Sequence, residues 1–221
     1  DLCTLFENKK YKDVVKHGIE TCKYRKTSCH LLNLIGSSYL HLQNYEKARE
    51  YLTSSIKINS SFADPYSNLA VIEEFIGNID KAIFYYNKAL HIKNDFPAIK
   101  YNLSLLNLNQ GKFNLAWKYF ESRWKIIGVE NKIKKLSGLR WSPSISKDHH
   151  VTIWPEQGIG DYILYSRFLN DLSSNVNHIT ALIDKKLKPL YSRTFPQIEF
   201  ITECDPSTID YHAPIGDLAK F

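Results

Sequence analysis

Several features that define common protein classes are missing from this 221-residue sequence. No run approaches the roughly 18 apolar residues of a membrane span, and the first residues lack the apolar centre of a signal peptide. The 4 cysteines include no C-x-x-C pair, and three of them fall in helical patterns, where cysteine is usually a small buried hydrophobe. We therefore expect no transmembrane segment, no bound metal, no disulfide framework and a reducing, cytoplasmic setting.

Acidic residues are scarce in the first part of the chain. Residues 1–140 contain 22 Lys and Arg against 13 Asp and Glu, whereas residues 141–221 contain 7 against 10. A basic half of this kind is compatible with a nucleic-acid or acidic-membrane role. The lysines are, however, scattered over polar helix faces in a chain generally rich in Lys, Asn and Ile. We interpret them as a solvated surface and expect no nucleic-acid partner.

A repeat of 34 residues organises this basic half. Two columns of residues recur at that step, one at Tyr11, Tyr45, Ile79 and Phe113, and one at Val14, Ala48, Ala82 and Ala116. The pattern is that of the tetratricopeptide repeat, a helical hairpin that buries its apolar face by stacking on its neighbours into a superhelix. Methionine is absent from the chain, but the unbroken spacing argues against deletions between positions 11 and 116.

We predict an α-helical tetratricopeptide superhelix over residues 1–130, with a partial unit at 1–28 and complete units at about 29–62, 63–96 and 97–130. Large aromatic residues gather in the last helix of this region, and we interpret them as interface packing: Trp117, Tyr119, Phe120 and Trp124. Residues 131–148 contain lysines, serines, glycine and proline between isolated apolar residues. They are predicted to form a linker.

Asn68 and Asn102 occupy the same column of the repeat. In this they resemble the repeats of protein O-GlcNAc transferases, where asparagines on the concave face hold extended peptide backbone. The resemblance implies that Asn68 and Asn102 bind a protein or peptide partner. Leu34 holds the same column one unit earlier, with Asn33 beside it, so a second interpretation, of ordinary polar or capping asparagines, remains open.

Residues 149–221 alternate between strand and helix patterns. Strands are expected at 151–155, 178–183 and 198–202, with helices at 161–172 and 185–192. Such alternation predicts an α/β domain with a parallel sheet, whose ligand site lies beyond the carboxyl ends of the strands. His149 and His150 are adjacent in an extended segment and therefore point to opposite sides, which argues against a shared metal ion.

The turn after the first of these strands reads Glu-Gln-Gly-Ile-Gly-Asp at residues 156–161, followed by Tyr-Ile-Leu-Tyr-Ser-Arg-Phe-Leu. This stretch closely resembles the signature of tetratricopeptide-repeat proteins that carry a glycosyltransferase domain related to heptosyltransferases. That family has a GT-B fold of two Rossmann-like domains, of which the first mainly binds the acceptor and the second the nucleotide-sugar. The resemblance implies that residues 149–221 are the Rossmann-like N-terminal part of such a domain, in a fragment that lacks the donor-binding part.

Asp161 matches the family's Gly-Asp position, whose carboxylate is the proposed general base. The resemblance also implies acceptor contacts from Glu156, Gln157, Gly158, Gly160, Asp210 and His212. The last two belong to residues 209–218, similar to the family's Asp-x-His and Pro-Leu-x-Ser-Leu run, but with Ile215 for Leu and Asp217 for Ser. The alternative interpretation of Asp161 is a helix N-cap.

Two functions follow. In the first, the intact chain is a glycosyltransferase that moves a sugar from a nucleotide-sugar donor to a sugar or glycan acceptor, with no other cofactor and with the repeats recruiting the acceptor or a partner protein. In the second, the transferase domain is degenerate and the chain is a non-catalytic scaffold for protein-protein interaction.

Overall fold

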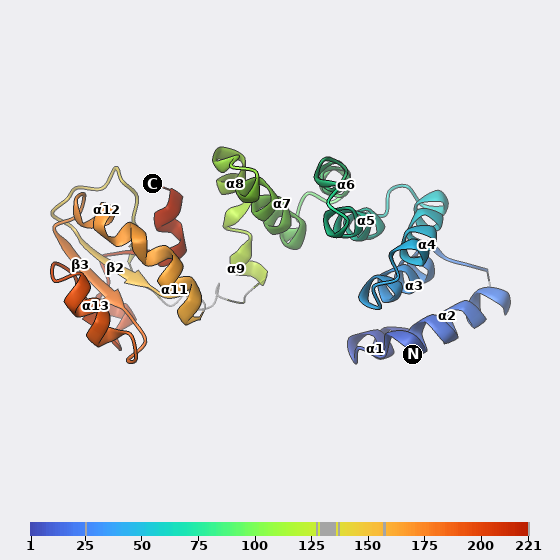
Figure 1. Ribbon diagram of the computed structural model, residues 1–221, viewed down its shortest axis with the longest axis horizontal. Coiled ribbons are helices and arrows are strands. Elements are labelled where there is room, and N and C mark those ends of the chain that lie inside the picture. Colours follow the sequence, from blue (N-terminus) through green and yellow to red (C-terminus); the bar gives the residue numbers. More distant parts are fainter. Residues whose placement is uncertain (25, 127, 129–135, 137, 157, 221) are drawn as a thin grey trace. The chain divides into compact units, whose positions relative to one another are not determined.

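The computed structural model describes residues 1–24, 26–126, 128, 136, 138–156 and 158–220. The chain forms two compact units, Asp1–Arg123 and Trp124–Phe221. In Figure 1 the first unit is coloured from blue to green, and the second continues through yellow to red. The first unit consists of helices, and the second is built around a parallel sheet.

The helices of the first unit pair into consecutive hairpins. The pairs are α1 (Leu2–Glu7) with α2 (Tyr11–Tyr24), α3 (Cys29–His41) with α4 (Tyr45–Ile58), α5 (Asp64–Phe75) with α6 (Ile79–Ile92), and α7 (Pro97–Asn109) with α8 (Phe113–Phe120). The short helix α9 (Arg123–Ile126) follows. This series of hairpins is the arrangement that the 34-residue repeat predicted.

The turn inside each hairpin has the same backbone conformation. Lys9, Gln43, Gly77 and Gly111 stand one repeat apart and have positive φ angles of 58°, 59°, 82° and 70°. The following N–H donates to a carbonyl at the end of the first helix, as from Asn78 N to Glu73 O at 2.8 Å. This left-handed closure satisfies carbonyls that a helix end leaves without partners.

Small residues let the two helices of a hairpin approach closely. Ala48, Ala82 and Ala116 are all 0% exposed, as the repeat columns required. A Cβ atom added to Gly36 would lie 2.7 Å from Cγ of Leu52, so no larger residue fits there without movement. Larger side chains one turn further along the second helices fill the core: Leu52, Tyr86 and Phe120.

A buried ion pair connects neighbouring hairpins. The Glu73 carboxylate of α5 is 1% exposed and accepts hydrogen bonds from Arg49 of α4 and, at 2.9 Å, from Nδ2 of Asn78. Burial raises the pKa of the Glu73 carboxyl, but the hydrogen bonds from Arg49 and Asn78 outweigh burial and hold the pKa below its usual value. Glu73 is therefore ionised at neutral pH, and its charge is matched inside the unit.

The second unit has a five-stranded, fully parallel sheet in the order β1-β5-β2-β3-β4. Its strands are β1 (Leu139–Arg140), β2 (His150–Trp154), β3 (His178–Leu182), β4 (Glu199–Ile201) and β5 (Tyr211–Pro214). The three strands expected from the sequence are present as β2, β3 and β4, with ends that differ by one residue at most. A parallel sheet was therefore predicted correctly for this part of the chain.

Three sequence expectations need correction. Residues 139 and 140, assigned to the linker, form strand β1 on β5, and a Cβ atom at Gly138 would lie 2.5 Å from the carbonyl oxygen of Ile209, so this approach requires glycine. The single helix expected at 161–172 is instead α11 (Ile159–Tyr165), the 3-10 turn η1 (Ser166–Phe168) and α12 (Leu169–Ser173). Helix α13 (Lys188–Thr194) begins later than expected, with proline in its first turn.

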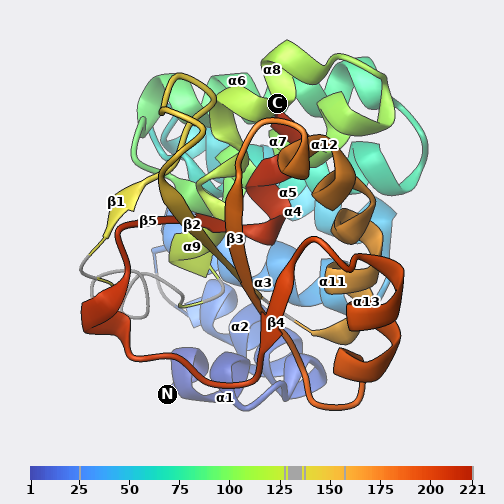
Figure 2. The same ribbon diagram turned by 90° about the vertical axis from the view of Figure 1, so that its left-hand side faces the viewer.

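The two faces of the sheet differ. Helices α11, α12 and α13 lie on one side of the strands (Figure 2), and they pack on alternate apolar strand residues, among them Val151, Ile153, Ile179, Ala181 and Phe200. The residues between these have the opposite orientation and are mostly polar: His150, Thr152, Thr180, Glu199 and His212. The short 3-10 turns η2 (Pro206–Thr208) and η3 (Ile215–Lys220) complete the unit.

Candidate functional site

A hollow of about 350 Å³ lies at the carboxyl ends of β2, β3 and β4. It is lined by three segments that follow these strands, and its residues are Pro155, Gly158, Ile159, Tyr162, Leu182, Ile183, Asp184, Leu187 and Thr202. The position is the one expected for a ligand site on a parallel sheet, where the loops after successive strands meet.

Helix α11 begins beside this hollow. Its N-cap residue is Gly158, with no side-chain cap, and Asp161 lies in the first turn. The alternative interpretation of Asp161 as the N-cap is therefore wrong. A Cβ atom added to Gly158 or Gly160 would meet no other atom within 4 Å, so the packing of the described residues does not itself require glycine at either position.

Tyr162 lines the same hollow and is 3% exposed. Its hydroxyl is buried and has no hydrogen-bond partner among the described residues. Burial, and then the neighbouring Tyr191, raise the pKa of the Tyr162 hydroxyl far above its ordinary value. The phenol therefore keeps its proton at neutral pH.

The Glu156 carboxylate connects distant parts of the second unit. Its Oε2 accepts a hydrogen bond from Nε1 of Trp124 at 3.1 Å, and its Oε1 accepts one from the backbone N–H of Gly216 at 3.1 Å. Glu156 therefore holds the turn after β2 to the segment after β5. Gln157, expected to contact an acceptor, lies outside the described residues.

Neither His212 nor Asp210 lines this hollow. His212 is 5% exposed on the polar face of the sheet, where its Nδ1 accepts a hydrogen bond from Nε1 of Trp154 at 3.1 Å. Burial and then the charge of Arg140 lower the pKa of His212, against the opposing charge of Asp217. Asp210 immediately precedes β5, at the amino ends of the strands, so the structure does not bring it together with Asp161.

Asp217, Arg140 and Lys220 form a charged cluster that the sequence analysis did not identify. Asp217 is 2% exposed and forms ion pairs with Arg140 and, at 2.9 Å, with Nζ of Lys220. The Arg140 guanidinium also lies 4.5 Å from the ring centroid of Trp124. Asp217 thus has two cationic partners. A buried acid of this kind is stable only when paired.

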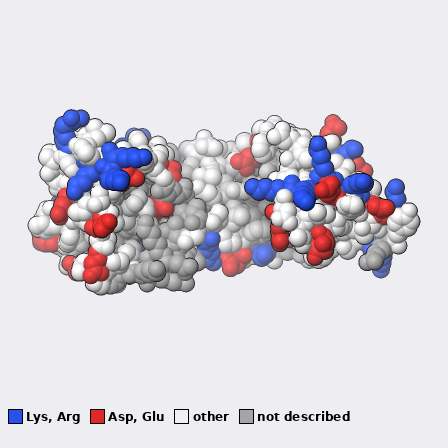
Figure 3. All heavy atoms as spheres, turned by 90° about the horizontal axis from the view of Figure 1, so that it is seen from below, with Lys and Arg blue, Asp and Glu red and all other residues white. Residues whose placement is uncertain are grey.

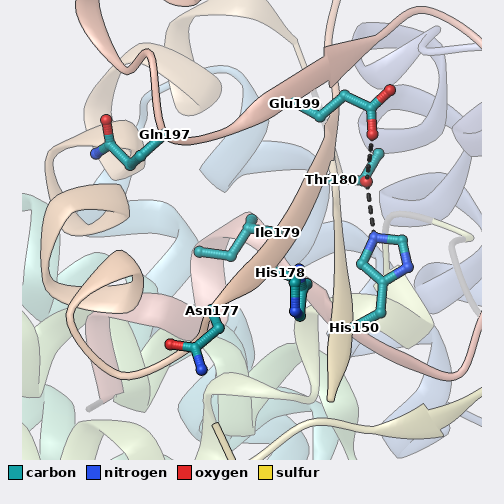
Figure 4. A pocket seen from close by; sticks show the side chains of 7 residues that line it. All are labelled: His150, Asn177, His178, Ile179, Thr180, Gln197 and Glu199. Carbon is teal, nitrogen blue, oxygen red and sulfur yellow. Dashed lines mark hydrogen bonds between the residues drawn. The ribbon is translucent and has the colours of Figure 1, made fainter. Parts of the chain in front are cut away.

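A second hollow, of about 440 Å³, lies at the amino ends of β2, β3 and β4. Figure 4 shows Glu199, Thr180 and His150 in line there. The Thr180 hydroxyl donates to Oε2 of Glu199 at 3.2 Å, so it accepts from Nε2 of His150 at 2.7 Å. The ring of His149 instead packs against the ring of Tyr211, with the two centroids 4.8 Å apart. No group of three or more His, Cys, Asp or Glu residues with metal-binding geometry is found in the described part of the chain.

The first unit has a hollow of about 470 Å³ between α5, α6 and α7, lined by Val71, Glu74, Phe75, Tyr86 and Asn102. Nδ2 of Asn102 donates to the Tyr86 hydroxyl at 3.0 Å, and this hydroxyl donates to Oε2 of Glu74 at 3.1 Å. One unit earlier, Nδ2 of Asn68 donates to Oδ1 of Asn33 at 3.1 Å. Asn33, which stands one position before Leu34 in the sequence, thus forms a hydrogen bond with Asn68 of the asparagine column.

Within each unit the basic side chains are interspersed with acidic ones. Figure 3 shows Asp and Glu side chains beside the Lys and Arg side chains. We expect labelled single- and double-stranded oligonucleotides to show no salt-sensitive binding near physiological ionic strength, because phosphate binding needs several cations on one path. A micromolar affinity that falls steeply with added salt in a titration would contradict this expectation.

Comparison with known proteins identifies the repeats. A sequence model described as "Tetratricopeptide repeat" matches residues 30–62 and 63–96. The chain is similar to protein FlbA of Caulobacter vibrioides, with 22% identity over 175 residues that cover 76% of this chain and 29% of FlbA. The chain thus spans less than a third of that relative. The tetratricopeptide repeats predicted from the sequence are confirmed.

The solved structures that resemble the chain include a crystal structure of MamA and a chain of the Cut9-Hcn1 hetero-tetramer. The crystal structure of MamA has 25% identity and a TM-score of 0.51, and the match covers 60% of this chain and 77% of MamA. A chain of the Cut9-Hcn1 hetero-tetramer of the APC/C has 19% identity and a TM-score of 0.50, over 56% of this chain and 24% of the other. These likenesses, with the matched repeats, show that the first unit has a tetratricopeptide-type fold. None of the described helices combines the length and apolarity needed to cross a bilayer.

Proposed function

We propose that the tetratricopeptide repeats bind an extended segment of a partner protein along the first helices of the hairpins, α3, α5 and α7. The observation that carries the proposal is the hollow beside Tyr86, into which Asn102 and Glu74 extend the polar groups of two successive units. Asn68 and Asn33 continue these groups by one unit. Carboxamide side chains offer both donors and acceptors, which is what an extended backbone requires.

The proposal is tested by selecting random linear peptides from a displayed library on the purified protein. The double variant Asn68→Ala/Asn102→Ala is expected to weaken binding of the selected peptides about 10-fold or more, because each lost hydrogen bond contributes about 1 kcal/mol. Asn87→Ala, at an exposed asparagine on α6, is the matched control and should bind as the unaltered protein does. Peptides that bind both variants equally, or no selected peptides at all, would exclude this surface.

We further propose that the second unit is the acceptor-binding part of a GT-B glycosyltransferase. Support comes from the resemblance of residues 156–161 to the family signature, and from the hollow at the carboxyl ends of the strands, which Gly158 and Tyr162 line while Asp161 lies in the same helical turn without lining it. In this proposal Asp161 takes the proton of an acceptor hydroxyl as its oxygen attacks the anomeric carbon of the donor sugar, and the nucleoside diphosphate leaves. Gly158 and Gly160 give the acceptor access to the backbone, and the cellular setting is cytoplasmic.

The residues of the sequence-predicted acceptor site have unequal support. Tyr162, which the sequence did not single out, adds a buried phenol at the hollow, whereas both oxygens of Glu156 already accept hydrogen bonds from Trp124 and Gly216. We therefore propose that Glu156 shapes the site by fixing the turn after β2. The nucleotide-sugar must be bound by a second Rossmann-like domain, and the described residues hold a single parallel sheet. Transfer of labelled sugar by the full-length protein tests the proposal.

A further inference from the structure

We propose that the hollow at Glu74 recognises a lysine or arginine side chain of the bound segment, so that the partner of the repeats carries a basic residue at one fixed position. The inference rests on the proposed binding of an extended segment and names the chemistry of that partner.

Charge is divided unequally between the two helices of each hairpin. The first helices α3, α5 and α7 contain three acidic residues, Asp64, Glu73 and Glu74, and a single basic one, Lys100. The second helices α4, α6 and α8 contain six basic residues against three acidic ones. Apart from Glu73, which Arg49 neutralises, the first helices thus carry two acidic residues against one basic residue in a unit that is basic as a whole, a balance compatible with a basic side chain of the partner.

Glu73 and Glu74 are adjacent, but only one of them is neutralised. Glu73 is buried and paired with Arg49. Glu74 is half-buried at the hollow, and no Lys or Arg of the described residues forms an ion pair with it. Its Oε2 accepts a hydrogen bond from the Tyr86 hydroxyl at 3.1 Å. Within the described part of the chain its Oε1 accepts no hydrogen bond. A half-buried carboxylate that is held in place and lines the hollow is suited to an ammonium or guanidinium group.

Tyr86 fixes this carboxylate in position. Its side chain is 0% exposed, and its hydroxyl also accepts a hydrogen bond from Nδ2 of Asn102 at 3.0 Å. Burial and then the charge of Glu74 raise the pKa of Tyr86 far above its ordinary value, so the phenol keeps its proton and can only donate it toward Glu74. The chain from Asn102 through Tyr86 to Glu74 therefore orients a negative charge, and the asparagine column is physically connected to it.

An aromatic ring stands beside the charge. Phe75 lines the hollow, is 70% exposed, and has its ring stacked on Tyr45 with centroids 5.6 Å apart. A cation is attracted to the face of such a ring, and the aliphatic stem of Lys or Arg can lie along apolar groups such as Val71. In the units before and after, the position of Glu74 is held by Leu40 and Leu108, so the arrangement occurs once among these three units and sets the register of the segment.

The test begins with the sequences of peptides selected from the displayed random library on the purified protein. We expect Lys or Arg to be enriched at one position, and Glu74→Gln to abolish the enrichment. Peptides that depend on Asn68 and Asn102 but show no basic preference would overturn this inference and leave the proposed function standing. Failure to select any peptide would overturn both.

A selected peptide then allows a double-mutant cycle by fluorescence anisotropy. Glu74→Gln and replacement of the peptide's basic residue by Gln are each expected to weaken binding about 5- to 10-fold, and together by little more than either alone, because both remove the same interaction. Glu50→Gln, at an exposed glutamate of α4, is the matched control and should change affinity less than twofold. Fully additive effects, with melting temperatures unchanged, would overturn the proposed contact.

Discussion

Replacing Ala82 by Asp is expected to cost several kcal/mol of folding free energy and to unfold neighbouring hairpins together. Ala82 is 0% exposed and belongs to the core shared by α5, α6 and α7. A carboxylate there loses its hydration inside a cluster of buried apolar residues. Because each repeat is stabilised largely by contacts with the next, the loss extends beyond one hairpin.

Thermal denaturation followed by circular dichroism measures this effect. Asn87→Asp is the matched control, since it adds the same charge to the same helix at an exposed position and should change stability by about 0.5 kcal/mol or less. A melting temperature of Ala82→Asp equal to that of the unaltered protein would contradict the assignment of position 82 to the small-residue column. If Ala82→Asp unfolded only one hairpin, that result would contradict the coupling between units.

The repeats were predictable because their packing imposes a period on the sequence. Ala48, Ala82 and Ala116 are small for one physical reason, the close approach of two helices, so the column can be identified without knowing the structure. The left-handed residues at the turns could not be identified in this way. Lys9 and Gln43 adopt the same positive φ as Gly77 and Gly111, so residue type did not reveal the shared conformation.

The α/β unit was predictable where its strands are buried. Strands β2, β3 and β4 carry apolar residues that pack under helices, whereas β1 has two exposed residues, and its pairing depends on β5, far along the chain. The predicted helix at 161–172 is interrupted at Ser166, whose hydroxyl lies 2.9 Å from that of Tyr191 and bonds the carbonyl oxygen of Ile163 at 2.8 Å. Tertiary contacts of this kind leave no local signal.

The candidate site was predictable by position but not by contact. The sequence placed the turn at 156–161 at the carboxyl ends of the strands, and the hollow is found there. It could not show that Glu156 contacts Trp124 and Gly216, which lie 32 and 60 residues away. It also grouped Asp210 with this turn, whereas the direction of β5 puts Asp210 at the opposite ends of the strands.

Replacing Asp161 by Asn is expected to lower the turnover of sugar transfer by the full-length protein about 10²- to 10⁴-fold, with a nearly unchanged melting temperature. Asn has almost the same shape as Asp but cannot accept the proton of an attacking hydroxyl. Since Gly158 is the N-cap of α11, the structural contribution of Asp161 is limited to a negative charge in the first turn, which typically contributes about 0.3–1 kcal/mol. Stability and turnover are therefore separable at this position.

The measurement compares transfer from the nucleotide-sugar donor at saturating acceptor for the unaltered protein, Asp161→Asn and Asp171→Asn. Asp171 is the matched control, because it is an exposed aspartate in the first turn of the neighbouring helix α12 and loses the same charge in the same helical setting. Its turnover should stay within about twofold of the unaltered protein, because it lacks a role in proton transfer. If Asp161→Asn also retained turnover within a few-fold, Asp161 would be a first-turn charge only, and the hollow would be a binding element without the proposed base.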